Sequence, residues 1–153
     1  MRGGNGTTRG MTAVEFAMIF PLLVVLVLGL LEAGNMLSDW LTVRKAAEAG
    51  ARFASTGQGD EEGLRLALIR AEVGRVMSRL PGGADEVQVV SWPTTAASGA
   101  GTENDAGCPC GLVEVRVDYA YRPLTPFLEG VIGETLLLTG TDRKVNEPWQ
   151  RCE

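Results

Sequence analysis

The chain has 153 residues, of which 45% are hydrophobic and 22% charged, a length that excludes a large multidomain enzyme. It contains no histidine, which excludes Ser-His-Asp and Cys-His catalysis as well as histidine metal sites and pH switches. The formal net charge of −5 argues against a general nucleic-acid-binding protein, which normally carries a basic surface.

The first predicted element is a membrane-spanning helix. Residues 16–31, which begin at Phe16, include no charged residue. All of them are hydrophobic except Pro21 and Gly29. A spanning helix needs about 20 apolar residues. The run is therefore slightly short, unless it extends back over Met11 and includes Glu15.

The charges around the run predict its orientation. Residues 1–14 carry Arg2 and Arg9 and no acidic residue, a pattern that keeps the N-terminus in the cytoplasm and sends the rest across the membrane. A cleaved secretory signal would also explain a short run, but residues 31–35 suit signal peptidase poorly. We therefore expect a single-pass anchor with its C-terminal domain outside the cytoplasm.

Glu15 and Pro21 are the unusual residues of this segment. A carboxylate inside a membrane costs about 3 kcal/mol, so Glu15 calls for a partner unless it lies at the interface. Pro21 removes a backbone donor, which membrane helices tolerate. It gives either a passive kink or a site of local bending.

The helix is expected to continue out of the membrane through residues 32–54, which contain no proline. One face carries small residues at spacings of three and four: Ala46, Ala47, Gly50 and Ala54. Small residues allow another element to approach closely. The stripe packs either on the protein's own sheet or against other subunits.

Residues 61–80 predict a second, amphipathic helix that ends at Pro81-Gly82-Gly83. Its arginines fall off the apolar stripe and are expected on a solvated face: Arg65, Arg70, Arg75 and Arg79.

Three strands are expected after this helix, at residues 87–92, 113–121 and 134–141. Residues 113–121 alternate apolar and polar side chains, as an antiparallel sheet with one buried face requires. The glycine-rich stretch 94–111 is too long for a hairpin and is expected to be a mobile or functionally variable loop.

Three cysteines lie outside the predicted membrane helix, where disulfides are expected. A Cys-x-Cys ring between Cys108 and Cys110 would be strained, which favours a bridge from Cys152 to one of them. An intermolecular bridge and a redox pair remain alternatives. Three thiols without histidine make no credible metal site.

Taken together, residues 9–54 resemble the TadE-like minor pseudopilins of Tad/Flp (type IVc) pilus systems. The resemblance rests on three blocks: Arg9-Gly10-Met11-Thr12-Ala13-Val14-Glu15-Phe16-Ala17 followed by Pro21-Leu22-Leu23, then Leu30-Leu31-Glu32-Ala33-Gly34, then Ala46-Ala47-Glu48-Ala49-Gly50-Ala51-Arg52-Phe53-Ala54. Two stretches are similar but much weaker: residues 121–127 and 145–147.

The resemblance implies processing and assembly. A prepilin peptidase would cut between Gly10 and Met11, where a residue without a side chain lets the protease reach the scissile carbonyl. Glu15, the fifth mature residue, would pair with an α-amino group of its own or a neighbouring subunit. The implied partners are other pilins and pseudopilins, the peptidase and the inner-membrane assembly machinery.

We therefore expect a pilin-like α+β protein with a cleaved leader (1–10), a membrane and spine helix (11–54) and an extracytoplasmic domain (55–153) carrying a three-stranded antiparallel sheet. It would be a minor pseudopilin in the bacterial inner membrane or the pilus. We expect no catalysis, no cofactor and no nucleic-acid partner. The alternatives are a type II secretion pseudopilin, an uncleaved anchored binding module and an extracytoplasmic thiol oxidoreductase.

Overall fold

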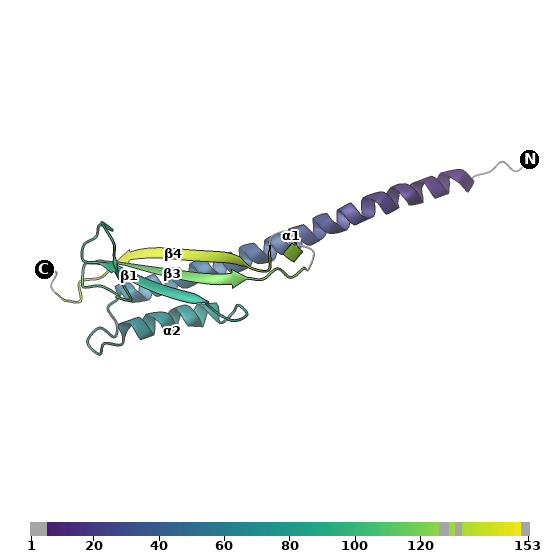
Figure 1. Cartoon of the computed structure of the whole chain (residues 1–153). Helices are drawn as coiled ribbons and strands as arrows, with labels where there is room; N and C mark the ends of the chain where they lie inside the picture. Colours follow the sequence, from purple (N-terminus) through teal and green to yellow (C-terminus); the bar gives the residue numbers. More distant parts are fainter. Residues whose placement is uncertain (1–5, 126–128, 131–132, 151–153) are drawn as a thin grey trace, which may run out of the picture.

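One long helix runs through the whole molecule. The computed structural model describes residues 6–125, 129–130 and 133–150, and its first element is α1 (Gly6–Ser55). The N-terminal half of α1 projects away from the rest of the protein, and its C-terminal half lies against a sheet (Figure 1). The helix continues through Pro21. The expected continuation from the apolar run into the domain is confirmed.

The domain adds a second helix and an antiparallel sheet to the end of α1. These elements are α2 (Arg65–Met77), β1 (Glu86–Trp92), β2 (Thr102–Glu103), β3 (Leu112–Tyr121) and β4 (Leu136–Val145). The strand order is β2-β1-β3-β4, with every neighbouring pair antiparallel. The α+β class is confirmed.

The sheet has four strands, so the prediction of three is wrong. The additional strand, β2, lies inside the stretch 94–111 that was expected to be a plain loop, and it pairs with Val90 and Ser91 of β1. Two residues are too few to produce an alternating pattern, which explains why the sequence does not predict this strand.

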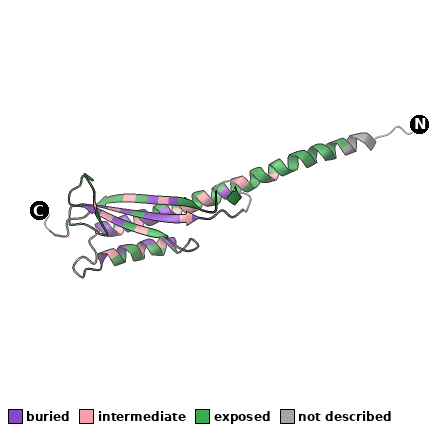
Figure 2. Ribbon diagram, in the orientation of Figure 1, coloured by how far each residue is buried: buried purple, intermediate pink, exposed green. Residues whose placement is uncertain are grey.

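The core lies between the sheet and the second half of α1. Val113, Val115 and Val117 of β3 are fully buried, whereas Arg116 faces solvent. Figure 2 shows the buried residues gathered on the sheet, α2 and this half of α1, while the projecting half is exposed. Small residues of α1 make the close packing possible.

Two glycines mark close approaches between α1 and the rest of the domain. A Cβ on Gly50 would lie 2.6 Å from Val73 Cγ2 of α2 and 3.1 Å from Val115 Cγ1 of β3. A Cβ on Gly140 of β4 would lie 2.7 Å from the carbonyl oxygen of Val43. The backbone of α1 therefore rests directly on β4 and is fixed relative to the sheet.

Candidate assembly surface and its attachment to the domain

The projecting half of α1 is an apolar surface with no cover from the rest of the described chain. Among the described residues, one helix is long and apolar enough to cross a membrane, within Met11–Ser55. Its exposed side chains include Phe16, Met18, Ile19, Leu22, Leu23, Leu26, Leu30 and Leu31. An exposed apolar surface of this extent requires lipid or other helices around it.

The residues of the predicted processing site lie at the start of this helix. Gly10 and Met11 are both in α1, and the Met11 side chain is exposed. Glu15 follows Met11 by four residues, so the two share one helix face. Glu15 is exposed and makes no ion pair with the other described residues. A new α-amino group on Met11 would lie on the same face.

Two features of the apolar surface, a pair of aromatic rings and a glycine, make no contact with the rest of the described domain. The rings of Phe16 and Phe20 stack at a tilt with their centroids 5.4 Å apart. A Cβ on Gly29 would meet no atom within 4 Å. Because the fold itself does not require a glycine at this position, Gly29 leaves room on the outside of the helix.

The small-residue stripe lies elsewhere, inside the domain. Ala46, Ala47 and Ala54 are fully buried, and Gly50 packs between α2 and β3. These residues hold α1 against the protein's own elements. They are therefore not available to other subunits while the domain is folded.

A buried carboxylate joins α1 to the sheet where the helix leaves the domain. Glu32 is only 5% exposed. Its Oε1 accepts hydrogen bonds from the Tyr121 hydroxyl at 2.5 Å and from the backbone N–H of Leu124 at 2.9 Å, and Thr125 Oγ1 lies 3.4 Å from Oε2. Burial and the hydrogen bond to Glu32 raise the pKa of Tyr121, so its hydroxyl remains a donor at neutral pH. We call Glu32, Tyr121, Leu124 and Thr125 the Glu32 clamp.

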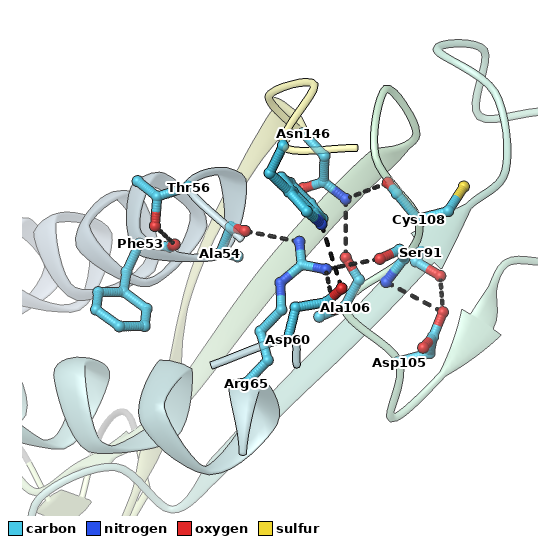
Figure 3. Close-up of polar contacts among 12 residues, drawn as sticks. Phe53, Ala54, Thr56, Asp60, Arg65, Ser91, Asp105, Ala106, Cys108 and Asn146 are labelled. Atoms are coloured by element: carbon cyan, nitrogen blue, oxygen red, sulfur yellow. Dashed lines mark hydrogen bonds and ion pairs between the residues drawn. The ribbon is translucent and has the colours of Figure 1, made fainter. Parts of the chain in front are cut away.

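A second buried polar group closes the other end of α1 (Figure 3). Arg65 donates from Nη2 to the carbonyl oxygen of Ala54 at 2.7 Å and from Nη1 to that of Gly107 at 2.7 Å. Its guanidinium also lies 4.3 Å from the ring centroid of Trp149. Arg65 thus satisfies a carbonyl at the helix C-terminus, where no intrahelical donor remains.

The prediction that all the arginines of the second helix lie on a solvated face is wrong for Arg65, which is 4% exposed. Arg70, Arg75 and Arg79 are exposed as expected. Arg65 stands four residues before Ile69, so it shares the buried face of α2. This four-residue spacing is the feature of the sequence that could have predicted the burial of Arg65.

The segment after β4 is tied to both α1 and the glycine-rich loop. Asn146 is 2% exposed and donates from Nδ2 to the carbonyl oxygens of Ala106 at 3.0 Å and Cys108 at 2.9 Å. The backbone N–H of Glu147 donates to the carbonyl oxygen of Ser55 at 2.8 Å. The sequence offers no pattern that predicts a buried Asn146.

The cysteine predictions are resolved only in part. Cys108 is a free and exposed thiol, whereas Cys152 lies outside the described residues. The backbone N–H of Cys110 donates to the carbonyl oxygen of Asn146 at 3.2 Å, which places Cys110 beside the segment that leads to Cys152. The loop-to-tail bridge stays a prediction. Within the described ranges no group of three or more His, Cys, Asp or Glu residues could hold a metal ion.

Comparison with known proteins agrees with the resemblance read from the sequence. Residues 10–52 match the family model of TadE-like proteins. The match covers Met11, Glu15, Glu32 and Gly50, and it ends before the second helix. No curated protein and no solved structure matches the chain.

Proposed function

We propose, on the premise that residues 10–52 are TadE-like, that this protein is a structural subunit that takes part in assembling a Tad/Flp-type pilus. A prepilin peptidase cleaves it between Gly10 and Met11. The mature protein lies in the bacterial inner membrane with its N-terminus in the cytoplasm and its domain outside. There it joins other pilins and pseudopilins in an initiation, tip or base complex.

One observation carries this proposal: the TadE-like match coincides with a projecting apolar helix that bears Glu15 four residues after Met11. A carboxylate on a lipid-facing helix is stable only with a partner. Cleavage after Gly10 creates an ammonium group on the same helix face, and a neighbouring subunit supplies an equivalent one. Processing and assembly thus account for a charge that a plain anchor has no reason to carry.

The buried position of the small-residue stripe indicates where subunits meet. Because Ala46, Ala47, Gly50 and Ala54 pack inside the domain, contacts with other pilins fall on the projecting half of α1. Gly29, which has open space around it, is suited to the close approach of a neighbouring helix. The domain then distinguishes this subunit from its neighbours.

The test is the intact mass of the membrane-extracted protein and of a Gly10→Ala variant. We expect the native chain to start at Met11 and the variant to remain unprocessed. Gly34→Ala is the matched control, because a Cβ there also meets nothing within 4 Å, and it should be processed normally. Processing of Gly10→Ala at Met11, or a native chain that keeps Met1, would contradict the proposal and favour an uncleaved anchored module.

Assembly is tested separately from cleavage. We expect Glu15→Gln to be processed but not to cross-link, through a cysteine placed at Gly29, to the major pilin of a Tad system. Glu48→Gln, an exposed carboxylate further along α1, should cross-link like the native protein. Cross-linking to type II secretion pseudopilins instead would support that alternative.

A further inference from the structure

The length of the apolar run leaves the outer membrane boundary undefined. At a rise of about 1.5 Å per residue, Phe16–Leu31 covers about 24 Å, whereas the hydrocarbon core is roughly 30 Å thick. The residue that ends the run in the sequence is Glu32. In the folded protein, however, Glu32 is a member of the Glu32 clamp and is only 5% exposed.

The shielding of Glu32 lengthens the uncharged outer surface of α1. Tyr121 and Leu124 supply hydrogen bonds that replace water around the carboxylate. The next ionisable residue along the helix is Asp39. From Phe16 to Ser38 the helix therefore shows no exposed ionisable side chain, a length of about 34 Å.

Exposed leucines lie at the end of the domain where α1 leaves it. Leu124 is 68% exposed, and its backbone N–H is bonded to Glu32. Leu137 is 61% exposed on β4, where it pairs with Ala120, next to Tyr121. Leu37 is 53% exposed on α1 itself. Figure 1 shows the end of β3 beside the point where α1 leaves the domain. We call Leu37, Leu124 and Leu137 the leucine collar.

We propose that the leucine collar lies in the outer interface of the phospholipid bilayer, so that the membrane boundary falls beyond Glu32 and the domain rests on the lipid surface. Leu37 continues the exposed apolar side of α1, and Leu124 is bonded to α1 at Glu32, so lipid around the helix is the occupant of the collar. The proposal rests on the membrane anchoring in the proposed function and is independent of cleavage and pilus assembly.

Charged residues near the collar limit how deeply it enters. Arg122 is exposed next to Leu124, where it can meet lipid phosphates, and Glu129 and Glu134 are exposed on the same connection. Carboxylates are excluded from the hydrocarbon core unless they are paired. The collar therefore stays at the level of the headgroups.

The test uses the full chain in vesicles of phosphatidylethanolamine and phosphatidylglycerol. A background in which Cys108, Cys110 and Cys152 are all replaced by Ser removes every native thiol, and single cysteines at Leu124 or Leu137 carry an environment-sensitive fluorophore. Leu23 is the label position in the membrane, and Gln58, exposed at the far end of α1, is the label position in water. Quenching by lipids with nitroxides in the headgroup region is then compared between the collar positions and Gln58, whereas quenching by lipids with nitroxides on the acyl chains reports whether Leu23 lies in the membrane.

We expect several-fold stronger headgroup quenching at Leu124 and Leu137 than at Gln58. Quenching at the level of Gln58, with Leu23 quenched by lipid, would overturn the collar proposal and leave the anchor intact. Blue-shifted emission without lipid quenching would overturn it too, because a protein partner would then cover the collar. If Leu23 itself stays unquenched, both the anchor and the collar fail.

A second measurement does not depend on labels in the collar. With the fluorophore at Leu37, Leu137→Asp should reduce headgroup quenching several-fold, because a carboxylate on the collar lifts it from the lipid. Val145→Asp is the matched control, since Val145 is an exposed apolar residue at the opposite end of β4, and it should have no effect. Equal quenching in the two variants would overturn the proposal.

Discussion

Removing the Tyr121 hydroxyl should loosen the connection between α1 and the sheet. In a Tyr121→Phe variant the ring still fills its buried site, but the carboxylate of Glu32 loses a donor that lies 2.5 Å away. A hydrogen bond to a charged group contributes about 1.5–3 kcal/mol. Because the N–H of Leu124 remains at 2.9 Å, we expect a loss of about 2 kcal/mol in the free energy of unfolding.

A double-mutant cycle separates this bond from other effects of the substitution. Glu32→Gln keeps an acceptor oxygen but removes the charge, so Tyr121→Phe should cost only about 1 kcal/mol in that background. The assay is urea unfolding of the full chain in detergent, followed by tryptophan fluorescence. Tyr119→Phe is the matched control, because Tyr119 is also buried on β3 and its hydroxyl has no hydrogen-bond partner among the described residues. A loss below about 0.5 kcal/mol in Tyr121→Phe, or additive effects in the cycle, would refute the reasoning.

The hydrogen bond between Tyr121 and Glu32 also makes the stability of the domain depend on pH in the alkaline range. The pKa of Tyr121 is raised above its ordinary value of 10.0, chiefly by burial and then by the hydrogen bond to Glu32. The folded state therefore holds this proton more tightly than the unfolded state does. Its contribution to stability is complete below pH 10 and declines as the pH rises above that value. Tyr121→Phe should show a smaller decline over the same range.

Three further substitutions or modifications test the remaining contacts. Arg65→Lys should lower the free energy of unfolding by about 2–4 kcal/mol, because one ammonium cannot reach both carbonyls that the guanidinium satisfies. Arg79→Lys, at an exposed position, is the control and should be neutral. Similar urea unfolding midpoints for the two variants would argue against the role of Arg65. Gly140→Ala should cost about 1–3 kcal/mol by forcing β4 away from the α1 backbone, while Gly74→Ala, with open space around it in α2, should be neutral or stabilising. Without reductant, mass spectrometry should find Cys108 alkylated and the other two cysteines bridged; alkylation of all three would exclude the loop-to-tail disulfide.

The parts of the fold that follow from periodicity could be predicted from the sequence. The apolar run and the proline-free stretch after it predict α1, and the alternation of valines with polar residues predicts β3. The predicted boundaries of β4 are less accurate: the strand was expected at residues 134–141, but it begins at Leu136 and continues to Val145. Residues 141–144 are polar and mostly exposed, so hydrophobicity does not mark the end of the strand.

The polar contacts that attach α1 to the domain could not be predicted, because they depend on residues far apart in the chain. Glu32 lies within the stretch that matches TadE-like proteins, Tyr121 lies far outside it, and no local pattern pairs the two. The sequence around Arg65 is typical of an arginine on a solvated helix face. Arg65 is buried because the C-terminus of α1 and the glycine-rich loop present carbonyl groups to its guanidinium. Such partners exist only once the tertiary structure has formed.

The Glu32 clamp also imposes an order on the biogenesis of the chain. Glu32 and its donor Tyr121 are separated by 89 residues. If α1 is inserted in the membrane as proposed, it emerges first during synthesis, and the Glu32 carboxylate has no Tyr121 donor until β3 has been made and translocated. Because the long-range contacts of the sheet form late, every nascent or truncated chain that stops before Tyr121 presents a bare carboxylate at the membrane surface.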